Sequence, residues 1–321
     1  MPDDKQTHVV FGAGQIGPLV AQQLLKQGHQ VRMVRRSAGA PPAGVSLRTG
    51  DAADPAFVAE ATQGASVLYH CMNPVYSAAE WQRTLPRWRQ ALLAAAARNR
   101  TRIVLLDNLY ALGLPRGMML SESSPIDPSS KKGAIRAHEW RSWLEAHQKG
   151  DAMITCGRAS DFYGPGATQT YFGDSFMPKA IGSGVAQTLT RLDTPHTYHY
   201  LHDVAAGLAT LGGAPDDAYG RWWMLPAAPA ESTRAMIARL GSALGQELKI
   251  QAMPRFMVSA LALFVPVLRE LSEMSYQWES AFVADDRAFR QRFGADATPL
   301  DVGARAMAEW ARMHYAASLG V

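Results

Sequence analysis

The first half of the chain alternates short apolar, β-branched runs with segments of helical periodicity. The runs predict strands at residues 8–11, 30–35, 45–49, 66–71, 102–106 and 153–156, with helices between them at 16–27, 55–63, 79–98 and 136–148. Regular alternation of strands and helices is typical of a parallel sheet with helices on both faces. The pattern therefore predicts a doubly wound α/β domain over residues 1–160.

After Arg158 this alternation loosens, and glycine, proline and aromatic residues accumulate. Helical periodicity returns at residues 204–211, 232–244 and 301–317. We therefore expect residues 161–321 to form a smaller C-terminal substrate-binding lobe, partly interleaved with the sheet of the first domain.

A glycine-rich segment joins the first predicted strand to the first predicted helix. It reads Gly12-Ala13-Gly14-Gln15-Ile16-Gly17. Glycines at this spacing allow a tight turn, a close approach of backbone to pyrophosphate, and close packing of helix on sheet. The helix N-terminus then favours the phosphates. The segment predicts a dinucleotide site in a Rossmann-type domain, and its alternative is a purely structural turn.

The end of the second predicted strand bears on the choice of dinucleotide. An NAD site would carry an acidic residue about 20 residues after the glycines, where it binds the ribose 2′-hydroxyl. Arg35 and Arg36 stand there instead, and a guanidinium binds a 2′-phosphate through paired hydrogen bonds. We expect NADP, with NADPH preferred over NADH, against the alternative of a solvated basic strand end. Asp51 and Ala52 are expected at the adenine, although Asp51 could equally cap a turn or helix.

Composition excludes several other classes of protein. The 321 residues are 47% hydrophobic and 19% charged, which is ordinary for a globular chain. The net charge of +4 is a small surplus, too small for a nucleic-acid-binding stripe. We expect part of this positive charge, at Arg35, Arg36, Lys132 and Arg136, to lie beside a phosphorylated cofactor. Two distant cysteines, Cys71 and Cys156, exclude a disulfide framework.

Targeting and membrane signals are also missing from the sequence. The first residues carry no apolar run typical of a signal peptide. The longest apolar stretch, residues 256–268, contains Pro266 and is too short to span a bilayer. We therefore expect a cytoplasmic protein without a membrane span. The apolar region 253–274, with Tyr276 and Trp278, is expected in the core or in a homodimer interface.

Four further segments accompany the glycine turn. They read GDAAD at residues 50–54, LDNLYALG at 106–113, RASDFYGPG at 158–166 and YLHDVA at 200–205. Together they resemble the extended and atypical short-chain dehydrogenase/reductases, the group that contains the NAD-dependent epimerase/dehydratases. The resemblance implies that residues 158–166 line the junction of cofactor and substrate sites. We expect further cofactor contacts at Cys71, Asn73 and Ala159, and substrate contacts at Asp161 and Tyr163.

The chain also departs from this family's pattern. Phe11 takes the first position of the usual G-x-x-G-x-x-G, which indicates the atypical branch. The resemblance places Asn108 at the active-site serine or threonine, Lys132 nearest the catalytic tyrosine and Arg136 at the catalytic lysine. No Tyr-x-x-x-Lys occurs in that helix.

These substitutions limit the chemistry of the predicted site. In the family's standard mechanism the tyrosine exchanges a proton with the substrate oxygen, and the lysine assists it and holds the nicotinamide ribose. Here Asn108 could polarise a carbonyl, Tyr110 or Lys132 could donate the proton, and Arg136 could hold the ribose. The alternative is that Lys131, Lys132 and Arg136 form a solvated helix start.

A mixed polar and aromatic run at residues 193–200 reads as a strand facing a pocket. His196 and Tyr198 are expected substrate contacts, and His196 and His199 would face opposite sides of the strand. Because a third ligand is missing, we predict no metal site.

The sequence thus predicts an NADP(H)-dependent oxidoreductase of the atypical short-chain type, acting on a small, fairly apolar carbonyl or related unsaturated substrate. The missing tyrosine and lysine leave two alternatives open. One is a non-catalytic NADP sensor or scaffold, and the other is a sugar-nucleotide epimerase or dehydratase.

Overall fold

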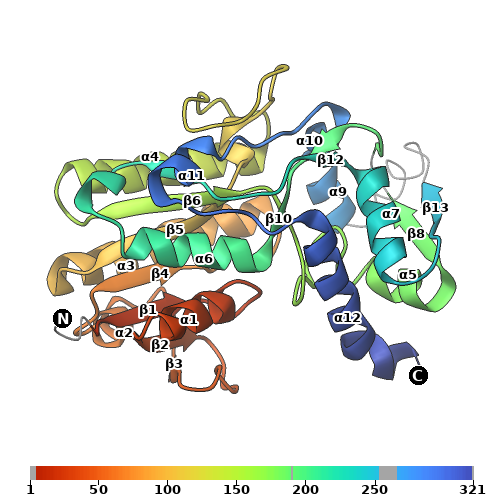
Figure 1. Ribbon diagram of the computed structural model, residues 1–321. Helices are drawn as coiled ribbons and strands as arrows, with labels where there is room; N and C mark the ends of the chain where they lie inside the picture. The colour runs from red at the N-terminus through yellow and green to blue at the C-terminus, as the bar shows by residue number, and fades with distance from the viewer. Residues whose placement is uncertain (1–4, 189–190, 253–265, 320–321) are drawn as a thin grey trace. The chain divides into compact units, whose positions relative to one another are not determined.

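The computed structural model describes residues 5–188, 191–252 and 266–319 (Figure 1). The chain divides into two compact units. Unit 1 comprises Met1–Ala111, Ile126–Ala159 and Val204–Leu225, and unit 2 comprises Leu112–Pro125, Ser160–Asp203 and Pro226–Val321. Most of the apolar stretch 256–268, and much of the wider region 253–274, lies outside the described residues.

Unit 1 is built on a seven-stranded sheet in which every pairing is parallel (Figure 1). Its strands are β1 (Thr7–Phe11), β2 (Gln30–Arg35), β3 (Ser46–Thr49), β4 (Val67–His70), β5 (Arg102–Asn108), β6 (Ile154–Ala159) and β11 (Trp222–Met224), in the order β11-β6-β5-β4-β1-β2-β3. The chain passes outward from β1 through β2 to β3 and then returns to β4. This order confirms the Rossmann-type doubly wound prediction. Sheets of this kind bind ligands in a crevice at the point where the strand order reverses, which here is at the carboxyl ends of β1 and β4.

The helices of unit 1 alternate with these strands. They are α1 (Gly17–Lys26), α2 (Pro55–Ala61), α3 (Ala78–Asn99), α4 (Lys131–Gln148) and most of α6 (Leu201–Gly212). All four residues of β4 are buried, as expected for a parallel strand covered on both faces. Helix α3 buries Trp81, Leu85, Trp88 and Leu92 along one face, at spacings of three and four residues.

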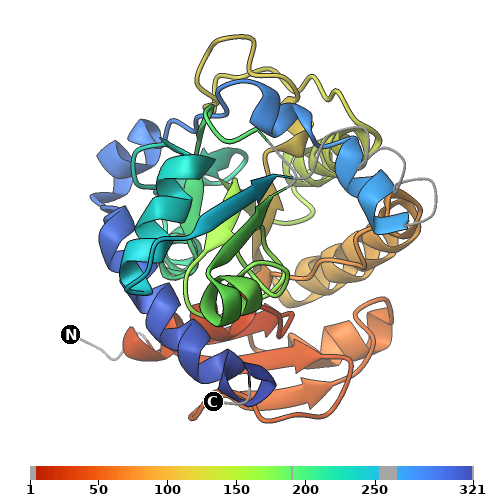
Figure 2. The same cartoon turned by 90° about the vertical axis from the view of Figure 1, so that its right-hand side faces the viewer.

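Unit 2 contains short strand pairs and helices (Figure 1, Figure 2). The pairs are β7 (Asp161–Tyr163) with β10 (Tyr198–Tyr200), β8 (Val185–Thr188) with β13 (Lys249–Ala252), and β9 (Pro195–His196) with β12 (Glu231–Ser232). The helices are α5 (Met177–Ser183), α7 (Thr233–Ala243), α9 (Pro266–Ser272), α10 (Tyr276–Glu279), α11 (Arg287–Phe293) and α12 (Leu300–Leu319). Helix α12 packs against both α5 and α7.

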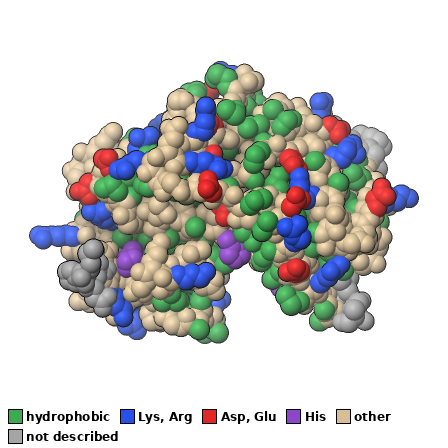
Figure 3. Space-filling model, viewed as in Figure 1, with side chains coloured by type: hydrophobic (Ala, Val, Ile, Leu, Met, Phe, Trp, Pro, Cys, Tyr) green, Lys and Arg blue, Asp and Glu red, His purple; other side chains and the backbone are tan. Residues whose placement is uncertain are grey.

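Charged side chains of both signs are interspersed on the face shown in Figure 3. Ion pairs within unit 2 include Arg239 with Glu231 and Arg290 with Asp286. Within the described ranges, no helix is both long enough and apolar enough to cross a bilayer.

Near the amino-terminal end of β1, His8 is buried in a polar aromatic cluster. Its ring stacks on His29 at 4.2 Å between centroids, and its Nδ1 lies 3.0 Å from the Tyr69 hydroxyl oxygen. Burial, with a smaller effect from the charge of His29, lowers the pKa of His8 from 6.5 to about 4. The fold therefore holds this imidazole in its neutral form.

This shift predicts an acid-dependent loss of stability. Because the folded pKa lies below the unfolded one, the contribution of His8 is complete above pH 6.5 and is lost as the pH falls towards 4. The loss is at most about 3 kcal/mol. His8→Asn, which keeps an acceptor for Tyr69, should flatten the decline in the free energy of unfolding between these pH values. Urea unfolding at several pH values measures it, and an equal slope in both proteins would contradict the assignment.

Candidate functional site

The glycine turn lies at the carboxyl end of β1 and is held by its neighbours. Gly12 has a φ of +109°, and its N–H donates to the carbonyl of Val34 on β2 at 3.0 Å. A Cβ at Gly12 would lie 2.8 Å from the carbonyl oxygen of Cys71, and a Cβ at Gly17 would overlap the Gly12 carbonyl oxygen. Packing within unit 1 therefore requires glycine at both positions.

Gly14 differs from these two glycines. It is exposed, and a Cβ built there would have no neighbouring atom within 4 Å. Packing within the chain does not account for a glycine at this position. The open space above Gly14 fits the close approach of a pyrophosphate.

The start of helix α1 forms the other part of the phosphate site predicted at the glycine turn, which we call the phosphate cradle. Its N-cap is Ile16, which provides no side-chain hydrogen bond, and its first turn carries no acidic residue. The N–H groups of this turn thus lack the side-chain acceptor that usually satisfies them. Ala13 and Gln15 are partly exposed beside Gly14, and Ile16 is buried. The segment fits an anionic dinucleotide, with the phosphates at the helix N-terminus.

The remaining predicted cofactor residues follow the strands of unit 1. Arg35 ends β2 and is half-buried, and Arg36 is exposed. Since Gly12 binds the carbonyl of Val34, both arginines follow directly after the residue that anchors the glycine turn. The Asp51 carboxylate accepts from Ala53 N–H at 2.9 Å and so caps its own turn. The neighbouring Ala52 is buried.

Three further predicted contacts lie at strand ends. Cys71 follows β4, and its N–H donates to the Phe11 carbonyl at 2.9 Å, next to the glycine turn. Burial raises the pKa of the Cys71 thiol to about 12, so it stays protonated at neutral pH. Asn73 is exposed in the loop before α3, and Ala159 is buried at the end of β6.

The helix that carries the predicted catalytic cations begins at Lys131, five residues before the predicted start. The Ser130 hydroxyl caps it by accepting from Gly133 N–H at 3.0 Å. Lys132 and Arg136 are therefore four residues apart on one helical face. Lys131 is exposed, but Lys132 is 0% and Arg136 8% exposed. A solvated helix start is wrong for these two residues, because both pack on aromatic rings.

Lys132 and Arg136 each pack on an aromatic ring that the sequence did not predict as part of the site. The ammonium nitrogen of Lys132 lies 4.8 Å from the ring centroid of Tyr76, in the loop after β4. The guanidinium carbon of Arg136 lies 4.3 Å from the ring centroid of Trp81 on α3. A sequence pattern could not reveal these contacts, because both rings precede α4 by about 50 residues.

Arg136 is also part of a buried charge network. Its Nη2 donates to the Asn73 side-chain oxygen, and its Nη1 lies 3.3 Å from Asp107 Oδ1. Arg158, which is fully buried, lies 3.2 Å from the other oxygen of Asp107 and donates to the Asn108 carbonyl at 2.6 Å. One carboxylate thus bridges two guanidinium groups. Asp107 belongs to the segment 106–113, but its bridging role was not predicted.

The two remaining predicted catalytic residues lie at the carboxyl end of β5. The side-chain oxygen of Asn108 accepts from Tyr110 N–H at 3.1 Å, which leaves the Asn108 amide nitrogen as the donor of that side chain. The Tyr110 hydroxyl oxygen lies 3.4 Å from that of Tyr76. Tyr110, Lys132 and Arg136 therefore contact Tyr76 or Trp81, and Asn108 joins this group through its bond to Tyr110.

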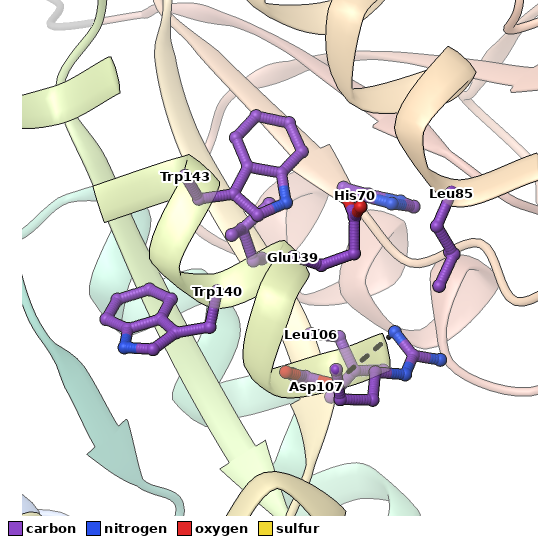
Figure 4. A pocket seen from close by; sticks show the side chains of 9 residues that line it. His70, Leu85, Leu106, Asp107, Glu139, Trp140 and Trp143 are labelled. Atoms are coloured by element: carbon purple, nitrogen blue, oxygen red, sulfur yellow. Dashed lines mark ion pairs between the residues drawn. The ribbon is translucent and has the colours of Figure 1, made fainter. Parts of the chain in front are cut away.

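A small, partly open pocket of about 20 Å³ lies beside Asp107 and Arg136 (Figure 4). It is lined by His70, Leu85, Leu105, Leu106, Asp107, Arg136, Glu139, Trp140 and Trp143. Burial and the charge of Arg136 lower the pKa of His70 to about 3, so it is neutral. The volume suits about one water molecule and is too small for a substrate.

The four predicted substrate residues lie in unit 2. Tyr198 on β10 pairs with Asp161 on β7, and the Tyr198 hydroxyl lies 2.8 Å from that of Thr233. His196 Nε2 lies 2.7 Å from the Asp161 carboxylate. Tyr163, His196 and Tyr198 are buried, while the Asp161 side chain is 23% exposed. Of the four, Asp161 alone is open to solvent within unit 2.

Ser160 contacts both His196 and His199. His199 Nδ1 accepts from Ser160 N–H at 3.0 Å, and His196 Nε2 lies 3.4 Å from the Ser160 hydroxyl oxygen. The expected continuous strand is divided into β9 and β10, between His196 and Tyr198. Over the ranges that the structure covers, no group of three histidine, cysteine or carboxylate side chains could hold a metal ion.

Comparison with protein families identifies the first half of the chain. A family model described as NAD(P)H-binding matches residues 12–159. No curated protein matches the sequence. The matched segment starts at the glycine turn and ends with β6.

Solved structures share the fold over almost the whole chain. A nucleoside-diphosphate-sugar epimerase from Pseudomonas aeruginosa is 18% identical, with a TM-score of 0.74 over 96% of this chain and 98% of that one. A UDP-glucose 4-epimerase from Bifidobacterium longum, solved with NAD⁺ and UDP, gives 17% identity and 0.76 over 96% and 98%. A dTDP-glucose 4,6-dehydratase from Streptomyces venezuelae, solved with NAD, gives 16% identity and 0.79 over 98% and 99%.

Proposed function

We propose that this chain, whose residues 12–159 match a family model described as NAD(P)H-binding, is an atypical short-chain dehydrogenase/reductase that acts as an NADP(H)-dependent oxidoreductase. Its substrate is a small, fairly apolar carbonyl or related unsaturated compound. The observation that carries the proposal is the gathering of Asn108, Tyr110 and Lys132 beside the crevice of a dinucleotide-binding sheet.

The cofactor assignment rests on the glycine turn and on Arg35 and Arg36. The open space at Gly14 and the start of α1 would hold the pyrophosphate. The two guanidinium groups would bind the 2′-phosphate that distinguishes NADP from NAD. When bound, NADPH supplies the hydride.

The protein's own residues would then handle the substrate oxygen. The Asn108 amide nitrogen and the Tyr110 hydroxyl are donors at the same strand end, and both can polarise a carbonyl. Lys132, 0% exposed, packs on the Tyr76 ring and supplies buried positive charge beside these donors. Arg136 is already engaged by Asp107 and Asn73, which supports a role in fixing the site more than in proton transfer.

A second candidate is a sugar-nucleotide epimerase, favoured by the likeness to the enzyme solved with NAD⁺ and UDP. The missing Tyr-x-x-x-Lys argues against it, since family epimerases depend on that tyrosine. Titration with a UDP-sugar distinguishes the two candidates. Micromolar binding of the UDP-sugar would support the epimerase.

Calorimetric titration with NADP⁺ and NAD⁺ tests the cofactor assignment. We expect NADP⁺ to bind more tightly, and the double variant Arg35→Ala/Arg36→Ala to lose about 10- to 100-fold of NADP⁺ affinity with little change for NAD⁺. Arg48→Ala, on the neighbouring strand β3, is the matched control. A preference of the wild-type protein for NAD⁺ would contradict the assignment.

Turnover is tested with a panel of carbonyl, imine and enone compounds and NADPH. Consumption of NADPH with one of them supports the proposed oxidoreductase. Binding of NADP⁺ and NADPH without turnover of any compound would instead favour a non-catalytic sensor.

A further inference from the structure

Helix α4 lacks the family's tyrosine, but the loops after β4 and β5 bring two other tyrosines together. Tyr76 lies between β4 and α3, and Tyr110 begins a single 3₁₀ turn at Tyr110–Leu112. Their hydroxyl oxygens are 3.4 Å apart. Both side chains are half-buried. The two hydroxyls are thus within reach of a long hydrogen bond, and both residues are partly open to solvent.

A buried tryptophan fixes both rings. Trp81, 1% exposed, packs edge-on against Tyr76 with centroids 5.6 Å apart and an interplanar angle of 90°. The same indole stacks on Tyr110 at 6.2 Å and 10°. On the other side, the Asn108 side chain holds the backbone of Tyr110. The hydroxyl pair is therefore placed by packed elements of unit 1, α3 and β5, and not by the loops alone.

A cation that packs on Tyr76 belongs to the helix that lacks the tyrosine. Lys132 is fully buried, and its ammonium nitrogen lies 4.8 Å from the ring centroid of Tyr76. A phenolate spreads part of its negative charge over the ring, and a nearby positive charge favours the ionised form of an acid. Lys132 is therefore positioned to stabilise negative charge on Tyr76.

We infer that Tyr76 is a proton-relay residue, which passes its hydroxyl proton to Tyr110 while Lys132 stabilises the phenolate left behind. The inference rests on the proposed reductase function. It assigns the proton donor that helix α4 does not supply, and it gives Lys132 an electrostatic role in place of proton donation. Tyr110 is the catalytic residue that contacts the substrate oxygen, and Tyr76 acts through it.

The step balances as a two-electron reduction. The carbonyl carbon accepts a hydride from the dihydronicotinamide, and the carbonyl oxygen takes the proton of Tyr110. Tyr110 then takes the proton of Tyr76, and solvent returns a proton to Tyr76. The sum is one hydride and one proton added to the carbonyl, which yields an alcohol and the oxidised nicotinamide.

The first test compares Tyr76→Phe with the wild-type protein across pH. Deleting only the hydroxyl should lower kcat by about 10- to 100-fold and alter the pH profile of kcat, with KM and NADPH affinity unchanged. Tyr219→Phe is the control, because its hydroxyl donates to the Leu211 carbonyl elsewhere in unit 1 and should leave kcat unaltered. An unchanged kcat and pH profile in Tyr76→Phe would overturn the relay while leaving the reductase function standing.

The second test needs no substrate. The ultraviolet absorbance of phenolate follows tyrosine ionisation, and the difference between wild type and Tyr76→Phe isolates Tyr76. In Lys132→Met we expect this ionisation to move to higher pH by about one unit or more. No movement would overturn the role of Lys132, whether or not a carbonyl substrate is found. Movement without turnover of any carbonyl would support the tyrosine–lysine pair and count against the reductase.

Discussion

Replacing Gly14 by aspartate should abolish NADP(H) binding and leave unit 1 folded. The residue is exposed, its φ lies outside the left-handed region, and no atom approaches the position of a Cβ. The fold therefore accepts a side chain there at little cost. A carboxylate at the phosphate cradle opposes the phosphates by charge and by volume, so the affinity should fall by about 100-fold or more. Calorimetry measures the affinity, and thermal unfolding without cofactor reports the fold.

Two control variants separate volume, charge and folding at this turn. Gly14→Ala adds volume without charge and should weaken binding less than Gly14→Asp. Gly17→Ala places a Cβ against the Gly12 carbonyl oxygen and should lower the melting temperature before any cofactor is added. If Gly14→Asp bound NADP(H) as tightly as the wild-type protein, the pyrophosphate could not lie over Gly14.

The sequence predicted the sheet well because its inner strands β1, β4 and β6 are buried along almost their whole length and so appear as continuous apolar runs. Of the seven strands, β11 alone was not predicted, since three residues, Trp222–Met224, leave no measurable periodicity. It joins the sheet by pairing with β6 at a separation of about 65 residues. Such a pairing depends on where the chain returns, which a local pattern does not encode.

The sequence predicted most residues of the candidate site but not the side-chain contacts between distant parts of the chain. Asn108, Lys132 and Arg136 were predicted from the resemblance to the short-chain dehydrogenase/reductases, and Tyr110 from its place two residues after Asn108. All four lie in unit 1. The aromatic partners Tyr76 and Trp81 were missed, because an aromatic residue in a loop or on a helix looks the same whether or not a cation packs on it.

Helix α4 begins at Lys131, five residues before its predicted start at Arg136. Gly133 lies between Lys132 and Arg136, and glycine disfavours helix interiors, which is consistent with a predicted helix that began only at Arg136. The cap from Ser130 and the packing of Lys132 on Tyr76 place the first turn five residues earlier. Tertiary contacts of this kind outweigh local propensity.

The buried arginine pair around Asp107 leads to the prediction with the largest effect on stability. Asp107 bridges Arg136 and Arg158, and its own side chain also accepts from the Asn108 N–H at 2.8 Å. Asp107→Asn keeps an oxygen for that N–H and nearly the same volume, but leaves two buried guanidinium groups without their carboxylate. Such a loss costs about 3–5 kcal/mol of the free energy of unfolding. Urea unfolding of unliganded protein at neutral pH measures it.

Charge, and not shape, should account for that loss, and a second substitution can show it. Arg158 lies between Trp140 and Trp222, with its guanidinium carbon 5.7 and 5.4 Å from their ring centroids. In the Asp107→Asn background, Arg158→Met removes one unpaired charge and keeps an apolar side chain between these rings, so it should restore part of the lost stability. Glu145→Gln, which breaks the exposed pair with Lys149, should leave stability unchanged. If the double variant were less stable than Asp107→Asn alone, packing and the bond to the Asn108 carbonyl would outweigh charge at Arg158. The arginine would then be retained for its contacts, and the carboxylate would be needed only to neutralise Arg136.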